Sequence, residues 1–176
     1  NIREDFLEKD ISAAAEMGVS QYQIDAGWDT GAQDKKTGRS YWTINRAAFP
    51  EDFRPFDALA EKLGVTPGVW FVPYTEDGHH YGCYQQDAQE LADLCLKHGM
   101  HTLKLDGFRL PDYTTTYRFE KMLQLVLEKT GSDVYFNIDI TNWPRTGLFG
   151  ATQYGNLFLE NRYTNRINYY PHGILR

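Results

Sequence analysis

One repeated unit limits the possible folds of this sequence more than any other feature: apolar residues at helical spacing, then a glycine, then a short apolar run. The helical stretches cover residues 6–15, 56–63, 88–95 and 119–126. Each is followed by a glycine that can take the left-handed conformation ending a helix: Gly18, Gly64, Gly99 and Gly131. The apolar runs predict strands at residues 19–24, 66–72, 100–105 and 134–138, and a fifth, without a clear helix before it, at 156–159.

The spacing of these runs predicts a parallel sheet. The predicted strand ends lie 48, 33, 33 and 21 residues apart, at Asp25, Pro73, Asp106, Asp139 and Glu160. A strand–helix–strand crossover takes about 30 residues or more and is almost always right-handed. No glycine-rich phosphate loop follows any of the runs, which disfavours an open nucleotide-binding sheet.

The two faces of the predicted strands differ in polarity. Gln23 and Asp25 share one face, as do Lys104 and Asp106, while apolar neighbours point the other way. An open sheet buried on both faces should be apolar on both. One face that turns polar toward the carboxyl ends is typical of a (β/α)8 TIM barrel, whose active site lies at that end. The sequence therefore predicts an α/β fold of this type.

The length predicts only part of such a barrel. A complete barrel takes about 250 residues, whereas the sequence has 176. We expect residues 1–176 to form a partial catalytic domain of about five strands, the second to the sixth, with the first and last strands missing. Because an incomplete barrel exposes sheet edges, the remainder of the parent chain is expected to close it.

Composition excludes several functional classes. The net charge of −6 and the pI near 5.3 argue against a nucleic-acid partner. No apolar run approaches the roughly 20 residues that span a membrane, and two cysteines cannot form a disulfide framework. A secreted or periplasmic location is one expectation, but no segment of the sequence indicates the compartment.

The predicted mouth of the barrel collects carboxyl groups from different strands: Asp25, Asp106, Asp139 and Glu160. Two carboxyl groups on either side of a bond are what glycoside hydrolysis requires, one ionised and one protonated. Lys104 lies on the same face as Asp106, and a cation there favours the ionised carboxylate. Asp106 is thus the better candidate nucleophile. The alternative for any single strand-end aspartate is that it only caps the next helix.

Aromatic residues are concentrated in the same predicted region, and flat apolar rings suit the faces of sugars. They are Trp28, Trp42, Trp70, Tyr74, Tyr81, Tyr84 and Trp143. Trp28 and Trp70 lie at or next to predicted strand ends, which favours them as substrate contacts. For the others, ordinary packing is the simpler interpretation.

Three segments together resemble a known family. The stretch Gln23-Ile24-Asp25-Ala26-Gly27-Trp28 is similar to the Ile-Asp-Asp-Gly-Trp segment of melibiase-type α-galactosidases, glycoside hydrolase families 27 and 36. Lys104-Leu105-Asp106 resembles their Lys-aromatic-Asp nucleophile segment, and Gly68-Val69-Trp70-Phe71 resembles the strand between them. The order of the segments agrees, and the similarity spans nearly the whole chain.

The resemblance implies a retaining glycoside hydrolase that acts on terminal α-linked sugars by double displacement, most similar to an α-galactosidase. It implies that Asp106 attacks the anomeric carbon and that Asp25 and Lys104 hydrogen-bond the hydroxyls of the terminal sugar. By the same analogy Trp70 and Asp139 line the sugar pocket. The expected partner is a carbohydrate, an oligosaccharide or glycoside, with no cofactor and no metal.

The sequence departs from the family pattern in two places. Ala26 stands where a second aspartate is usual, which removes one sugar-hydroxyl ligand and weakens the case for galactose. Asn165 lies near the place of the family's acid/base aspartate, and an amide cannot act as an acid. Glu160 is the nearest carboxyl group and the candidate acid/base. Arg162 either binds a sugar hydroxyl or pairs with Glu160.

Three other interpretations remain open. A barrel that has lost its acid/base can bind glycans without cleaving them, as Asn165 suggests. Lys104 inside a barrel can form a Schiff base, as in aldolases, although the neighbouring Asp106 disfavours the neutral amine that this reaction needs. His79 and His80 are adjacent and can ligate a metal, but no third ligand follows at a recognisable spacing.

Overall fold

The computed structural model describes residues 2–30, 42–73, 81–107, 109–139 and 152–158. In this described part the helices and strands follow in the order α1 (Glu4–Glu16), β1 (Gln21–Ile24), α2 (Arg54–Leu63), β2 (Thr66–Phe71), α3 (Tyr84–His98), β3 (Thr102–Leu105), α4 (Tyr113–Thr130), β4 (Tyr135–Asp139) and β5 (Gly155–Phe158). The predicted helices and strands are all confirmed, with bounds that shift by a few residues.

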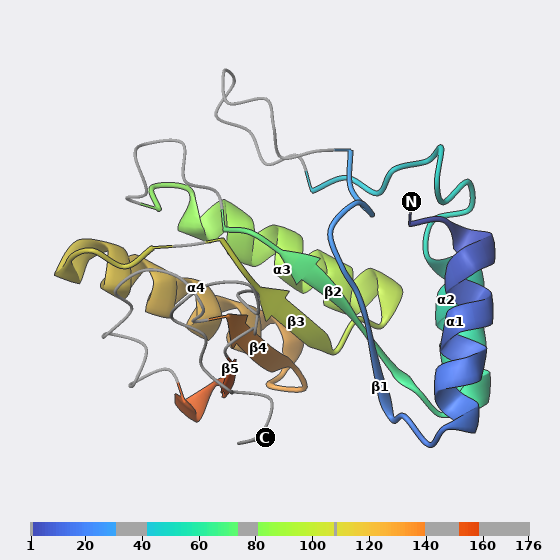
Figure 1. The fold of residues 1–176 in the computed structure, drawn as a ribbon. Coiled ribbons are helices and arrows are strands. Elements are labelled where there is room, and N and C mark those ends of the chain that lie inside the picture. The colour runs from blue at the N-terminus through green and yellow to red at the C-terminus, as the bar shows by residue number, and fades with distance from the viewer. Residues whose placement is uncertain (1, 31–41, 74–80, 108, 140–151, 159–176) are drawn as a thin grey trace, which may run out of the picture.

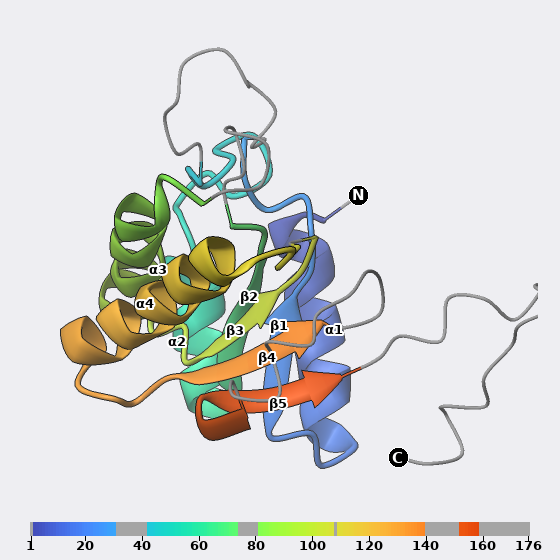
Figure 2. The same ribbon diagram turned by 90° about the vertical axis from the view of Figure 1, so that its left-hand side faces the viewer.

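The five described strands form one parallel sheet in the order β1-β2-β3-β4-β5. Sequential order has a direct consequence: right-handed crossovers that always step in the same direction place their helices on the same side of the sheet. A doubly wound sheet would reverse its order at some point. Figures 1 and 2 accordingly show α2, α3 and α4 together on one side of the strands. This is the arrangement of a barrel wall.

The core lies between the sheet and these helices. The strand residues that point toward the helices are almost completely buried, each at most 1% exposed: Ile24, Val69, Phe71, Leu103, Leu105, Phe136 and Ile138. Burying a side chain of this size stabilises the fold by about 1.5–3 kcal/mol. Their sequence neighbours Gln23, Trp70 and Asn137 point to the other face and keep part of their surface exposed. The alternation predicted from the sequence is therefore present in the sheet.

The helix ends follow the signals in the sequence. Gly64, Gly99 and Gly131 end α2, α3 and α4 in the left-handed conformation, with φ of 67°, 60° and 72°. At the other end of α4, the Asp112 side chain accepts a hydrogen bond from the Thr115 backbone N–H in a capping box. These local signals fix where α2, α3 and α4 end and where α4 begins, and so where β2, β3 and β4 can begin.

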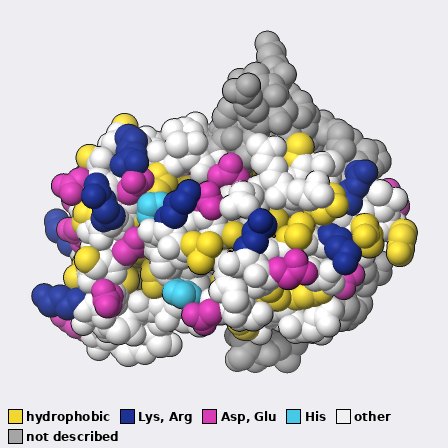
Figure 3. Space-filling view, turned by 180° about the vertical axis from the view of Figure 1, so that it is seen from behind, with side chains coloured by type: hydrophobic (Ala, Val, Ile, Leu, Met, Phe, Trp, Pro, Cys, Tyr) yellow, Lys and Arg dark blue, Asp and Glu magenta, His cyan; other side chains and the backbone are white. Residues whose placement is uncertain are grey.

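The outer surface carries charges of both signs. Figure 3, the side opposite to that of Figure 1, shows acidic and basic side chains next to one another among apolar ones. Among the residues that the structure describes, no helix is both long and apolar enough to cross a membrane.

Gly68 of β2 provides a test of the sheet packing. A Cβ added there would lie 2.3 Å from the backbone oxygen of Thr102 on β3. We predict that Gly68→Ala lowers the free energy of unfolding by about 3 kcal/mol, because two backbones would have to separate. Gly99→Ala is the control: it keeps a left-handed φ but meets nothing within 4 Å, and should cost about 1–2 kcal/mol. Urea unfolding of the full-length protein measures both, and an equal or larger loss at Gly99 would contradict the packing argument.

Candidate active site

The strand register places the candidate residues in one row. Trp70 of β2 pairs with Lys104 of β3, which pairs with Asn137 of β4. Paired residues in a parallel sheet point to the same face, so these three side chains all lie on the face opposite the helices. Asp25 follows β1 and Asp106 follows β3 directly, at the carboxyl ends of their strands. Asp25 and Asp106 therefore lie at the carboxyl-terminal end of the sheet, next to this row.

Asp25 and Lys104 form an ion pair between residues far apart in the sequence. The Lys104 Nζ donates to Asp25 Oδ2 at 2.8 Å. Lys104 is nearly buried, with 8% of its side chain exposed, whereas Asp25 keeps 57% of its own exposed. The ammonium also lies 5.7 Å from the centre of the Phe158 ring, within range of a cation–π interaction. The pair presents to solvent a carboxylate backed by a fixed positive charge.

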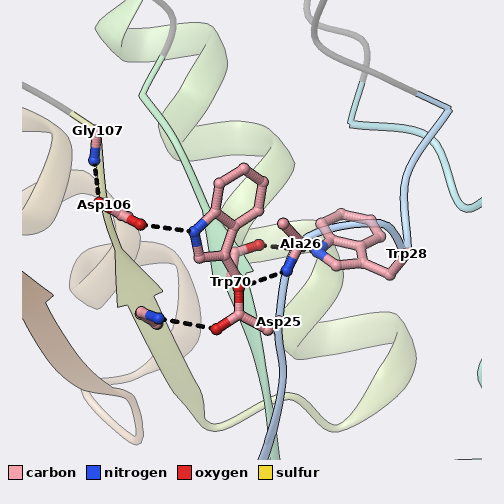
Figure 4. Close-up of polar contacts among 7 residues, drawn as sticks. Asp25, Ala26, Trp28, Trp70, Asp106 and Gly107 are labelled. Carbon is pink, nitrogen blue, oxygen red and sulfur yellow. Dashed lines mark hydrogen bonds and ion pairs between the residues drawn. The ribbon is translucent and has the colours of Figure 1, made fainter. Parts of the chain in front are cut away.

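Asp106 is held through both of its carboxylate oxygens. Oδ2 accepts a hydrogen bond from Trp70 Nε1 at 3.1 Å, and Oδ1 accepts one from the backbone N–H of Gly107 at 2.5 Å (Figure 4). Its own backbone N–H donates to the carbonyl of Phe71 at 3.0 Å. Donors on both oxygens fix the plane of the carboxylate. The side chain is half-buried, so a ligand can still reach it.

Trp70 is in turn positioned by a second tryptophan. The indole N–H of Trp28 donates to the carbonyl of Trp70 at 2.8 Å, and Figure 4 shows the Trp70 indole pointing toward Asp106. Trp28 itself is 0% exposed. It stacks on Trp42, with ring centres 6.0 Å apart, and packs against Phe53.

These contacts separate the two tryptophans that the sequence had grouped as substrate contacts. The ring of Trp28 is enclosed by the core and offers no surface to a ligand in the described structure. Trp70 is half-buried and lies in the row of candidate residues. Trp70 thus keeps part of its surface exposed in this row, whereas Trp28 is packed within the core; a contact of either residue with substrate stays a prediction. Position next to a strand end could not distinguish them.

Asp139 is the last residue of β4 and pairs in register with Phe158 of β5. It is completely buried. Glu160, Arg162 and Asn165 lie outside the described residues, so the acid/base assignment stays a prediction. Tyr74, His79, His80 and Trp143 also lie outside the described residues, and the roles considered for them stay predictions. Within the described part of the chain, no group of three or more His, Cys, Asp or Glu side chains is arranged to hold a metal ion.

A carboxyl group away from this end of the sheet has a strongly raised pKa. Burial, with a smaller effect of the nearby Asp52, raises the pKa of Asp57 to about 7. Asp57 is on α2, where its Oδ2 lies 3.8 Å from Nδ1 of His98 at the end of α3. Burial also lowers the pKa of His98. These groups sit between helices on the outer side of the sheet, so their shifts reflect helix packing.

Comparisons with known proteins identify the fold and the resemblance. No family model matches the chain. A curated α-galactosidase of Escherichia coli is 27% identical over 73 residues, which is 42% of this chain and 10% of that protein. The solved GH36 α-galactosidase AgaA of Geobacillus stearothermophilus superposes with a TM-score of 0.64 at 14% identity. The superposition covers 91% of this chain and 29% of the AgaA chain.

Two further solved structures agree. α-Galactosidase I of Mortierella vinacea has a TM-score of 0.64 at 22% identity and covers 89% of this chain and 41% of its own. A putative α-galactosidase/melibiase of Bacteroides fragilis has a TM-score of 0.63 at 20% identity, with 88% of this chain and 34% of its own covered. The chain thus spans well under half the length of each of these relatives. Both the predicted fold, part of a (β/α)8 barrel, and the predicted similarity to melibiase-type α-galactosidases are confirmed.

The pKa of Asp57 predicts a pH-dependent stability. A pKa raised from 3.8 to about 7 on folding means that the folded state binds more protons than the unfolded state between about pH 4 and pH 7. The contribution of Asp57 to stability is therefore complete below pH 4 and is lost as the pH rises through 7. We predict that Asp57→Asn raises stability relative to the parent protein at pH 8 and loses most of this advantage at pH 5.

Thermal unfolding between pH 5 and pH 8 measures this difference. Glu61→Gln, at an exposed site on the same helix, is the control and should follow the parent protein at every pH. A difference between Asp57→Asn and the parent that is the same at both ends of the range would contradict the shifted pKa.

Proposed function

We propose that this chain is the part of a retaining α-glycosidase, most similar to an α-galactosidase, that binds the terminal sugar and supplies the nucleophile. The observation that carries the proposal is the arrangement of Asp25 and Lys104 beside an Asp106 whose two oxygens are held by Trp70 and Gly107. Structures of the similar AgaA contain raffinose and stachyose, which supports a carbohydrate as the partner.

In the proposed reaction, Asp106 attacks the anomeric carbon of the bound sugar. The glycosidic bond breaks as the new ester bond forms, and the leaving oxygen takes a proton from a second carboxyl group. Water then attacks the glycosyl-enzyme, assisted by the same carboxyl group acting as a base, and releases Asp106 as a carboxylate. The bonds from Trp70 and Gly107 hold the carboxylate plane during both steps, which reduces the freedom lost at the transition state.

The ion pair of Asp25 and Lys104 has a binding role in this proposal. The exposed carboxylate of Asp25 accepts from sugar hydroxyls, and the ammonium of Lys104 donates to a sugar oxygen. Hydrogen bonds to charged groups discriminate strongly between hydroxyl arrangements. Trp70 completes the wall of the pocket, whereas Asp139, which is completely buried in the described structure, is not assigned a contact with the sugar. Ala26 leaves one corner without the usual carboxylate, so the identity of the sugar must come from assay.

We assign the acid/base role to Glu160 and a further contact with the sugar to Arg162. A retaining enzyme requires this carboxyl group about 5–5.5 Å from the nucleophile. The competing function is a glycan-binding barrel without hydrolysis. The observation in its favour is Asn165, an amide near the place where the family has its acid. The remainder of the parent chain is proposed to close the barrel in either case.

The test is hydrolysis of a panel of nitrophenyl α- and β-glycosides by the full-length protein, with Asp106→Ala and Glu160→Ala beside it. We expect one α-glycoside to be cleaved, with activity abolished in Asp106→Ala and strongly lowered in Glu160→Ala. If the full-length protein cleaves nothing on the panel yet binds a sugar by calorimetry, the binding function replaces the enzyme. Unchanged activity in Asp106→Ala would refute the assigned nucleophile.

Lys104→Met separates a functional ion pair from a structural one. We predict a fall in kcat/KM of about 100-fold, because a charged hydrogen bond worth about 3 kcal/mol is lost. Stability should change by less than about 1 kcal/mol, since the exposed Asp25 remains hydrated. Lys97→Met, which breaks the surface pair with Asp93, should alter neither quantity. If Lys104→Met lowers the free energy of unfolding by as many kcal/mol as its fall in kcat/KM represents, the ion pair has a structural role.

A further inference from the structure

Tyr81 combines three features that are unusual together. Its side chain is 1% exposed, although it lies in the connection between β2 and α3. Its backbone has a φ of 53°, in the left-handed region that a bulky residue rarely adopts. A backbone conformation of this kind persists only where the surroundings impose it, and such positions are concentrated at functional sites.

The surroundings of Tyr81 come from two other segments. Its hydroxyl oxygen accepts a hydrogen bond from the backbone N–H of Arg109 at 2.5 Å. Its ring packs edge-on against Phe119 of α4, with ring centres 6.4 Å apart. The side chain therefore joins the connection after β2 to the connection after β3. In a parallel sheet both connections leave the same edge, which is the edge that carries Asp106.

Arg109 lies three residues after Asp106 in the sequence. The segment that begins with Asp106 is held by hydrogen bonds at each of its two ends. At its start, the Asp106 N–H donates to the carbonyl of Phe71. At its end, Asp112 caps α4. Between these points the backbone N–H of Arg109 donates to the Tyr81 hydroxyl of a neighbouring connection. This bond restrains the backbone directly beyond the carboxylate.

We propose that Tyr81 is a positioning residue for Asp106: its buried hydroxyl holds the backbone at Arg109 and thereby fixes the direction in which the carboxylate faces the sugar. The inference rests on the proposed function. A nucleophile displaced by about 1 Å can lose about two orders of magnitude in rate, so a restraint three residues away is sufficient to affect the reaction. Binding of the sugar, which depends on Asp25 and Lys104, does not require this restraint.

The experiment compares Tyr81→Phe with the full-length parent protein, using the nitrophenyl α-glycoside that the parent cleaves fastest. Phenylalanine keeps the packing against Phe119 and removes only the hydroxyl. Tyr154→Phe is the control. The Tyr154 hydroxyl is also hydrogen-bonded, to Gln124 and Glu120, but Tyr154 directly precedes β5, at the end of the strands opposite to Asp106. kcat, KM and the unfolding temperature are measured for each, well below the unfolding temperature.

We expect Tyr81→Phe to lower kcat about 10-fold with KM within about twofold of the parent, a split that general loss of structure would not produce. Tyr154→Phe should keep kcat within about twofold of the parent, even if its unfolding temperature falls as far as that of Tyr81→Phe. If kcat of Tyr81→Phe equals that of the parent, or if both variants lose kcat equally, the positioning role of Tyr81 is overturned. The proposed hydrolase is unaffected by that result. If the parent protein cleaves no glycoside while it binds one, the proposed hydrolase fails and this inference fails with it.

Discussion

The register of β2, β3 and β4 is the constraint on which the site depends. It places Trp70, Lys104 and Asn137 side by side on one face and Phe71, Leu105 and Ile138 on the other. Because side chains alternate along a strand, a slip by one residue would turn Lys104 into the apolar core. Burial of the apolar set against the helices therefore fixes the orientation of the polar set.

The sequential order of the strands extends this division to the whole sheet. Helices that all pack on one side bury that side and leave the other for polar groups. The segment between β1 and α2 adds an aromatic cluster in which Trp28, Trp42 and Phe53 pack together. Trp28 then holds the carbonyl of Trp70, whose indole holds Asp106. Two hydrogen bonds, both made by Trp70, thus link the buried aromatic cluster to the candidate nucleophile. We expect the packing of this cluster to affect the orientation of the Asp106 carboxylate.

The elements and their faces could be predicted from the sequence because their signals are local. Helical spacing ended by Gly64, Gly99 and Gly131 gives the helices, and alternation around Lys104 and Asp106 gives the polar face. The ion pair between Asp25 and Lys104 was not predicted, because the resemblance implied only that each of them contacts the sugar. The resemblance to α-galactosidases suggested their roles before any geometry was known.

The remaining features depend on contacts between distant segments, which spacing does not encode. The burial of Trp28 follows from packing against Trp42 and Phe53, and nothing at the end of β1 indicates it. Tyr81 stood out in the sequence only as one aromatic residue among several, since neither its φ nor its bond to Arg109 leaves a local signal. The raised pKa of Asp57 likewise arises from two helices that meet in space.

The central claim is that Asp106 forms the bond to the sugar, and covalent trapping tests it most directly. A 5-fluoro glycosyl fluoride of the sugar that the full-length protein cleaves should form the glycosyl-enzyme faster than water can release it. Mass spectrometry of the digested protein then locates the label. The account predicts a sugar attached to the peptide that contains Asp106, at the side chain of that residue. A label on another carboxylate such as Asp139, or hydrolysis without any label, would contradict it.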